Sequence, residues 1–156
     1  MALKAGDPAE ADDVWLRVIT NKNYWRNDGT LHNSAFGGKG GFSPSQNRPW
    51  AHELSGRLLS LVQNLGQECI DFCGDRFAGV MFQKVENLRS EDSGWPTDVY
   101  YTPKVYDNAH ADFVSFKTKD KVEYYEVRDW LQDFIQHVKP NKLEAVEALR
   151  PAAAAK

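Results

Sequence analysis

The order of hydrophobic and polar positions predicts several short strands. Residues 14–20 are dominated by β-branched and aromatic side chains, which favour a strand with both faces covered. Similar apolar runs predict strands at 78–85, 99–101 and 111–116. A fifth candidate, 122–125, follows a lysine-rich turn and is expected to pair back along the chain.

Two apolar stripes predict the main helices. The first covers 50–65, where apolar residues recur at spacings of four, four, three and four: Trp50, Leu54, Leu58, Leu61 and Leu65. Pro49 suits the first turn of this helix and Gly66 its end. The second covers 127–138 and is carried by Val127, Trp130, Leu131, Phe134 and Val138. Pro140 is expected to end it.

These elements predict an α+β fold: a small antiparallel or mixed sheet of about 4–5 strands, packed by two main amphipathic helices. The acidic segment 1–12 is expected to be a flexible lead-in. Residues 13–140 suit a single globular domain, since compact domains have about this length. Residues 141–156 are expected to form a short helix and a frayed tail.

Composition and charge narrow the classes of function. The chain has 19 basic and 22 acidic residues and a net charge of −3, which disfavours overall electrostatic attachment to nucleic acid. No apolar run approaches the roughly 20 residues needed to cross a bilayer, so no membrane contact is expected. The N-terminal residues lack the apolar core of a secretory signal, and we therefore expect a cytoplasmic location.

The segment 21–50 inverts the charge of the chain, with four basic residues against one acidic residue. Its glycines and asparagines predict a long stretch without regular structure over 21–47. Glycine lets backbone N–H groups approach a phosphate, arginine binds anions bidentately, and aromatic rings stack on bases. The binding candidates are Tyr24, Trp25, Arg26, His32, Asn33, Ser34, Lys39 and Arg48. Alternatively, the aromatic residues pin a structural loop to the core.

Nucleophilic catalysis needs a thiol or hydroxyl, a base and a group that orients the base. Cys69 or Cys73 could serve as the nucleophile and His110 as the base. Asp112 shares a face with His110 if 110–116 is extended. In the alternative interpretation these cysteines are buried and His110 makes ordinary hydrogen bonds.

No metal site and no cofactor are expected. The two cysteines are four residues apart, and the histidines lack the H-x-x-x-H spacing of a helical metal site.

The sequence favours a non-enzymatic binding module, an accessory subunit of a larger assembly that acts through 21–50. A segment this long and aromatic is unusual for a simple connection. A protein partner is the first expectation, with an anionic small ligand or single-stranded nucleic acid as alternatives. The enzymatic alternative is a small hydrolase or transferase that uses Cys69 or Cys73 with His110.

Overall fold

The fold comes from a computed structural model that describes residues 3–36, 39–43, 48–90, 96–116 and 124–151. At 39–43, 48–52, 116 and 124–126 the description covers the backbone alone.

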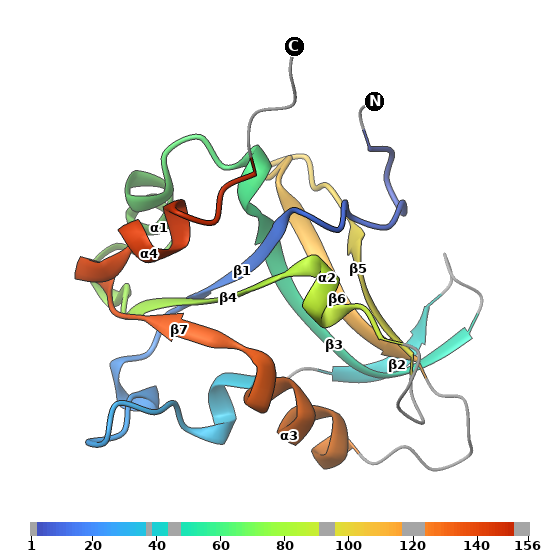
Figure 1. The fold of residues 1–156 in the computed structure, drawn as a ribbon, viewed down its shortest axis with the longest axis horizontal. Helices are drawn as coiled ribbons and strands as arrows, with labels where there is room; N and C mark the ends of the chain where they lie inside the picture. Colours follow the sequence, from blue (N-terminus) through green and yellow to red (C-terminus); the bar gives the residue numbers. More distant parts are fainter. Residues whose placement is uncertain (1–2, 37–38, 44–47, 91–95, 117–123, 152–156) are drawn as a thin grey trace.

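One antiparallel sheet of seven strands forms the centre of the described part of the chain. Its strands are β1 (Val14–Ile19), β2 (Lys39–Ser43), β3 (Arg48–Leu58), β4 (Gly79–Lys84), β5 (Thr97–Tyr101), β6 (His110–Phe116) and β7 (Gln136–Val138). The strand order is β5-β6-β3-β1-β4-β7, and β2 pairs with β3 outside this path (Figure 1). The α+β class is therefore confirmed, whereas the sheet is larger than the expected 4–5 strands.

Helices cover both faces of the sheet. They are α1 (Leu65–Cys73), α2 (Val85–Leu88), α3 (Tyr124–Phe134) and α4 (Glu144–Glu147). On one face, α1 and α4 pack on the same buried cluster as Leu16. On the other face, α2 and α3 pack around Trp15 and its neighbours. No helix in the described ranges is both long and apolar enough to cross a membrane.

Four of the expected strands are confirmed to within two residues, as β1, β4, β5 and β6. In β1 the side chains alternate between the two faces, and both Trp15 and Leu16 are fully buried. This burial on both faces explains why the apolar run 14–20 is nearly continuous.

The helix expected over 50–65 is wrong, because residues 48–58 form β3 and pair with β1 and β6. Positions 50, 54 and 58 are separated by even numbers, so an extended chain also places them on one face. Tertiary pairing decides between the two periods. The remaining part of the stripe fails as well, since Leu61 is exposed after the strand ends.

The second expected helix is confirmed only up to Phe134, where α3 ends. The Gln83 side chain donates a hydrogen bond to the Phe134 carbonyl and so satisfies one of the last helical acceptors. Residues 136–138 then pair with β4 as β7. The expected strand 122–125 lies partly outside the described residues, and its Tyr124 and Tyr125 are helical.

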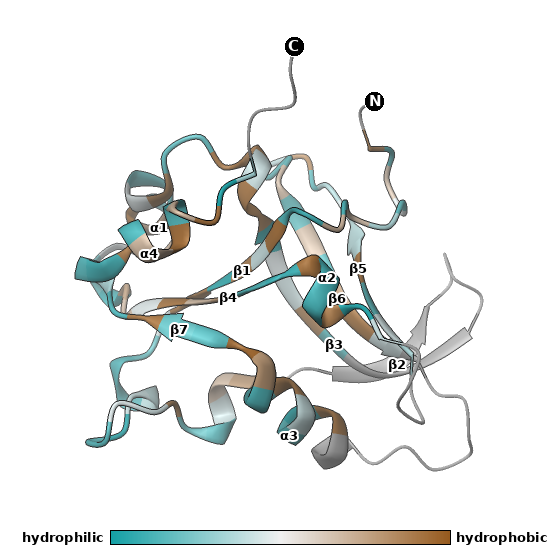
Figure 2. Ribbon diagram, viewed as in Figure 1, coloured by the Kyte–Doolittle hydropathy of each residue, from teal (hydrophilic) through white to brown (hydrophobic). Residues whose placement is uncertain are grey.

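The segment 21–47 contains more regular structure than expected. Short 3₁₀ turns occur at Lys22–Tyr24 and Asn33–Phe36, and Lys39–Ser43 forms β2. Figure 2 shows mainly hydrophilic residues between 20 and 30. The glycines in β2 hide its strand character, which comes from pairing with β3 rather than from its own side chains.

Both ends of the described chain contact the domain. The backbone N–H of Ala9 donates to the carbonyl of Val99, and Ala9 is buried. Near the other end, Arg150 donates to the carbonyls of Leu59 and Val62. The boundaries expected at 12 and 140 stay predictions.

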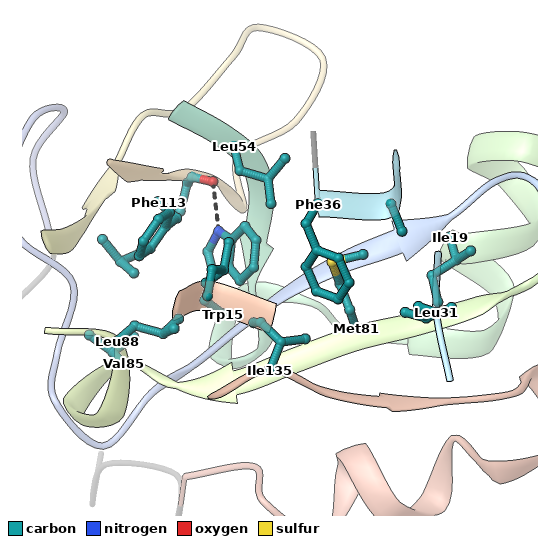
Figure 3. Close-up of a cluster of buried hydrophobic side chains, with 14 of the residues drawn as sticks. Trp15, Ile19, Leu31, Phe36, Leu54, Met81, Val85, Leu88, Phe113 and Ile135 are labelled. Atoms are coloured by element: carbon teal, nitrogen blue, oxygen red, sulfur yellow. Dashed lines mark hydrogen bonds between the residues drawn. The ribbon is translucent and has the colours of Figure 1, made fainter. Parts of the chain in front are cut away.

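Trp15 connects three strands. Its ring is fully buried beside Phe113, with ring centroids 6.2 Å apart, and its indole N–H donates to the Ala111 carbonyl at 3.1 Å (Figure 3). Gly56 of β3 pairs with Ala111, and a Cβ atom at Gly56 would overlap the Trp15 indole and the Leu16 carbonyl. The absence of a side chain at Gly56 therefore permits the contact between Trp15 and β6.

Replacing Gly56 with alanine is expected to lower the free energy of unfolding by about 1–3 kcal/mol, because the added methyl group has no free space. Gly66→Ala is the matched control. A Cβ atom there lies 3.7 Å from Leu143, an ordinary contact distance, and alanine favours the helix. Urea unfolding of both variants measures the difference, and equal stabilities would contradict the proposed close approach.

Candidate functional site

A pocket of about 450 Å³ opens on the face of the sheet that carries α1. Its walls come from β1, β3, α1 and the residues that precede and begin β6. Volumes of this size are typical of small-molecule sites. This pocket is the main candidate functional site in the described part of the chain.

The pocket lies where β1 and β3 separate. Their paired residues end with Leu16 opposite Arg57, and beyond this point the Arg17 guanidinium donates to the Ser55 carbonyl at 2.6 Å. Within the described ranges this is the guanidinium's one hydrogen bond. Burial lowers the pKa of Arg17, while Tyr24 and Asp112 act in the opposite direction. Arginine still remains protonated in proteins, so Arg17 has further N–H donors for a ligand.

Arg57, in contrast, is paired with two carboxylates through its Nε and Nη2 atoms. Its Nε donates to both carboxylate oxygens of Asp107 at 3.1 Å, and its Nη2 lies 2.8 Å from Glu68 Oε1. Burial opposes the charge of Arg57, but the hydrogen bonds to the two carboxylates raise its pKa. Burial likewise opposes ionisation of Glu68, whose pKa is nevertheless lowered by hydrogen bonds from Asn64 and Arg57. Arg57 therefore ties β3 to α1 and to the Asp107 turn.

His110 links the opposite wall of the pocket to β3. Its Nε2 lies 2.6 Å from Ser55 Oγ, and its Nδ1 lies 2.9 Å from the Thr102 carbonyl oxygen. Thr102 Oγ1 also lies 2.9 Å from Nδ1. Because a carbonyl oxygen only accepts hydrogen bonds, the tautomer that forms a hydrogen bond with it carries the proton on Nδ1. In the neutral ring Nε2 then accepts from the Ser55 hydroxyl. This arrangement presents a hydroxyl to an oriented imidazole.

The expected proximity of His110 and Asp112 is observed. The nearest carboxylate oxygen of Asp112 lies 3.9 Å from His110 Nε2, and both side chains are about 14% exposed or less. The two residues alternate with buried Ala111 along β6, which explains why they share a face. Asp112 is suited to stabilise a positive charge on the ring.

Part of the segment 21–50, which the sequence proposes for binding, instead contacts the rest of the fold. The Trp25 indole N–H donates to the Ala78 carbonyl at 2.7 Å, and its ring contacts the ring of His137 edge-on. Lys139 Nζ lies 5.2 Å from the Trp25 ring centroid. Tyr24 packs against the same core cluster as Trp25. These contacts support the interpretation that aromatic residues pin this segment.

Other candidates in the segment remain accessible. Arg26, His32 and Ser34 are exposed and Asn33 is half-buried, while the side chains of Lys39 and Arg48 lie outside the description. The Ser34 backbone N–H donates to His32 Nδ1 at 3.1 Å.

A shallower hollow adjoins the pocket at Thr20, and it contains Tyr24 together with Lys22, Asn23 and Arg76. Of the binding candidates in this segment, Tyr24 lines this hollow.

The cysteines of the enzymatic alternative lie buried in α1. Burial raises the pKa of the Cys69 thiol to about 12, and it also raises that of Cys73. A raised pKa reduces the thiolate fraction, which is the reactive form. Among the described residues, the His110 ring forms hydrogen bonds with Ser55 and Thr102 rather than with a cysteine.

Sequence reasoning missed Ser55, Arg57 and Arg17. The predicted helix includes Ser55 and Arg57, and in a helix alternation with every second residue does not define a face. In a strand, Ser55 and Arg57 lie on a polar face, and Leu54, Gly56 and Leu58 lie on the opposite, apolar face. That alternation was the available signal.

Comparison with family models, curated proteins and solved structures finds no match to this chain. Across the described ranges, no group of three or more His, Cys, Asp or Glu side chains is arranged to hold a metal ion.

Trp25→Ala is expected to lower the free energy of unfolding by about 2 kcal/mol or more, because it removes a half-buried ring and leaves the Ala78 carbonyl without its donor. Arg26→Ala, which changes an exposed neighbour, should shift it by less than about 0.5 kcal/mol. Chemical unfolding compares the two variants. Similar small effects would show that Trp25 does not pin the segment.

Both thiols of the native protein are expected to react with iodoacetamide slowly at neutral pH. The alkylation rate should be at least about 100-fold lower than in the urea-unfolded chain. The reason is the low thiolate fraction that follows from the raised pKa. Peptide mapping after timed alkylation measures each cysteine. Rapid labelling of one native thiol would instead favour the Cys/His alternative.

Proposed function

We propose that the chain is a binding module for a small ligand that joins an anionic group to an apolar or aromatic body. The observation that carries the proposal is Arg17, a half-buried cation at the pocket wall with a single hydrogen bond to described residues. A carboxylate or phosphate would occupy its remaining N–H donors bidentately.

The distribution of charge indicates that the anionic group of the ligand would bind at the end of the pocket near Thr20. Around Thr20 the described residues include Arg17, Lys22 and Arg76 against Asp75. At the other end, Arg57 pairs with both Glu68 and Asp107, and Asp71 adds a further carboxylate, so negative charge is in excess there. An anion is therefore favoured beside Arg17, and Tyr24 and Lys22 extend the site into the segment that the sequence singled out.

The rim of the pocket supports an apolar or aromatic body. Phe72 and Tyr106 line it and are 68% and 88% exposed, which is unusual for large apolar rings. A flat ring placed between them would remove apolar surface from water.

A protein partner is the second candidate function. Val105 is fully exposed beside Tyr106, and Ile70 is 53% exposed on α1 near Phe72. Several exposed apolar side chains on neighbouring segments are a feature of interaction surfaces, although of these four only Phe72 and Tyr106 line the pocket. In this form the protein would be an accessory subunit that receives a partner's acidic side chain at Arg17.

Phenyl phosphate is expected to bind the pocket saturably, and Arg17→Met should weaken binding by at least about tenfold, because it removes a charge-assisted hydrogen bond. Arg26→Met is the matched control and should bind as the wild type does, since Arg26 is exposed and outside the pocket lining. NMR titration measures both affinities and assigns the site.

Neutral benzyl alcohol should bind more weakly than phenyl phosphate. Equal binding of the two probes, or unchanged affinity in Arg17→Met, would overturn the anion-binding proposal. Failure of both probes to perturb the pocket would leave the protein-partner form as the better account of the rim.

A further inference from the structure

We propose that Ser55 is a nucleophile activated by His110, and that the pocket catalyses acyl transfer from small carboxylic esters to water. The sequence singles out His110 as a base but not Ser55 as its nucleophile, because the apolar stripe predicts a helix over 50–65. The inference goes beyond ligand binding and stands on the Ser55–His110 geometry, independently of any anion at Arg17.

The distance between nucleophile and base is within hydrogen-bond reach. Ser55 Oγ and His110 Nε2 are 2.6 Å apart, and hydroxyl activation by an imidazole requires a separation of about this size. The two residues lie on neighbouring strands, two positions apart in register, since Ser55 pairs with Asp112 and Arg57 with His110. The sheet itself therefore holds both groups in place, which favours a precise geometry.

The imidazole is oriented for base catalysis. Its Nδ1–H is directed to the Thr102 carbonyl oxygen at 2.9 Å, which leaves Nε2 as the acceptor for the serine proton. Thr102 follows β5, and its own N–H donates to the His110 carbonyl. Thr102 is thus a positioning residue that acts through its backbone.

Two charged groups are placed to stabilise the charges that develop. The Asp112 carboxylate, 3.9 Å from Nε2, faces the imidazolium that forms when the ring takes the proton. Arg17, bonded to the Ser55 carbonyl, is the cation in the same pocket that can face the oxyanion.

Access and shape suit an ester. Ser55 is exposed at the pocket, whereas the His110 side chain is only 14% exposed, so a substrate reaches the hydroxyl before the base. The rings of Phe72 and Tyr106 offer an apolar surface to the acyl or leaving group.

The reaction balances without any further reagent. Ser55 Oγ forms a bond to the ester carbonyl carbon, its proton moves to His110 Nε2, and the bond to the leaving alkoxide breaks as that proton passes to the alkoxide. Water then attacks the carbonyl carbon of the acyl-serine while His110 Nε2 accepts its proton. The bond between the acyl carbon and Ser55 Oγ breaks as that proton passes from His110 to Oγ. The products are the carboxylic acid, the alcohol and the original serine.

The test uses p-nitrophenyl acetate, a neutral ester, on the full chain. The wild type is expected to release p-nitrophenolate and to carry an acetyl group on Ser55, which peptide mapping by mass spectrometry locates. Ser55→Ala should lose this label, and His110→Gln should slow acylation by about 100-fold, the usual contribution of a general base. Ser60→Ala is the matched control, because Ser60 is an exposed serine outside the pocket lining.

Thermal unfolding of each variant shows whether it is folded. If the His110→Gln variant fails to fold, His110→Asn serves as the second variant. Acetylation of the wild type only at lysines, or equal rates in the wild type and Ser55→Ala, would overturn the inference. Either result leaves the anion-binding proposal standing, since its test uses phenyl phosphate and Arg17→Met.

Discussion

The packing of the Trp15 ring across Gly56 is the constraint on which the fold and its pocket depend. The ring fills the space that a side chain at Gly56 would occupy, and its N–H reaches the Ala111 carbonyl on the next strand. This contact sets β1, β3 and β6 side by side with one face directed to the main core. Because side chains alternate along a strand, Ser55 and Arg57 on either side of Gly56 must then face the opposite layer. The same strand register therefore directs Gly56 to the core and directs Ser55 and Arg57 to the pocket.

In the second layer, Arg57 joins the pocket walls beside the apolar cluster of Leu16, α1 and α4. Its guanidinium bridges Glu68 of α1 and Asp107 of the turn before β6, and each carboxylate also accepts backbone N–H groups. Removing one member would leave a half-buried charge without its partner, so the three groups act as a unit. They hold the pocket walls apart at a fixed distance. Arg17 is the pocket cation that this network leaves for a ligand, and the Ser55–His110 pair lies beside it.

Much of the fold follows from local patterns, and the main error has a physical cause. Strands β1, β4, β5 and β6 are evident from β-branched and aromatic runs that alternate or are buried on both faces. The segment 48–58 misleads because residues four apart lie on one face in a helix and in a strand alike. Its neighbours β1 and β6 supply the missing information, and the residues that pair with β3 lie far away in the sequence, as Leu16 does from Arg57. For the site, the shared face of His110 and Asp112 was predictable, since it depends only on the extended state of one strand.

What the sequence determined by itself is the class of the fold, the positions of most strands and the amphipathic start of α3, because these depend on the period of neighbouring side chains. Tertiary structure alone decided that 48–58 is a strand, that 136–138 pairs with β4, and that Ser55 meets His110 across 55 residues of chain. It also decided that Trp25 turns inward while Arg17 keeps free donors at a pocket wall. Each of these outcomes rests on which strand lies beside which, a choice made by long-range pairing that no local pattern encodes.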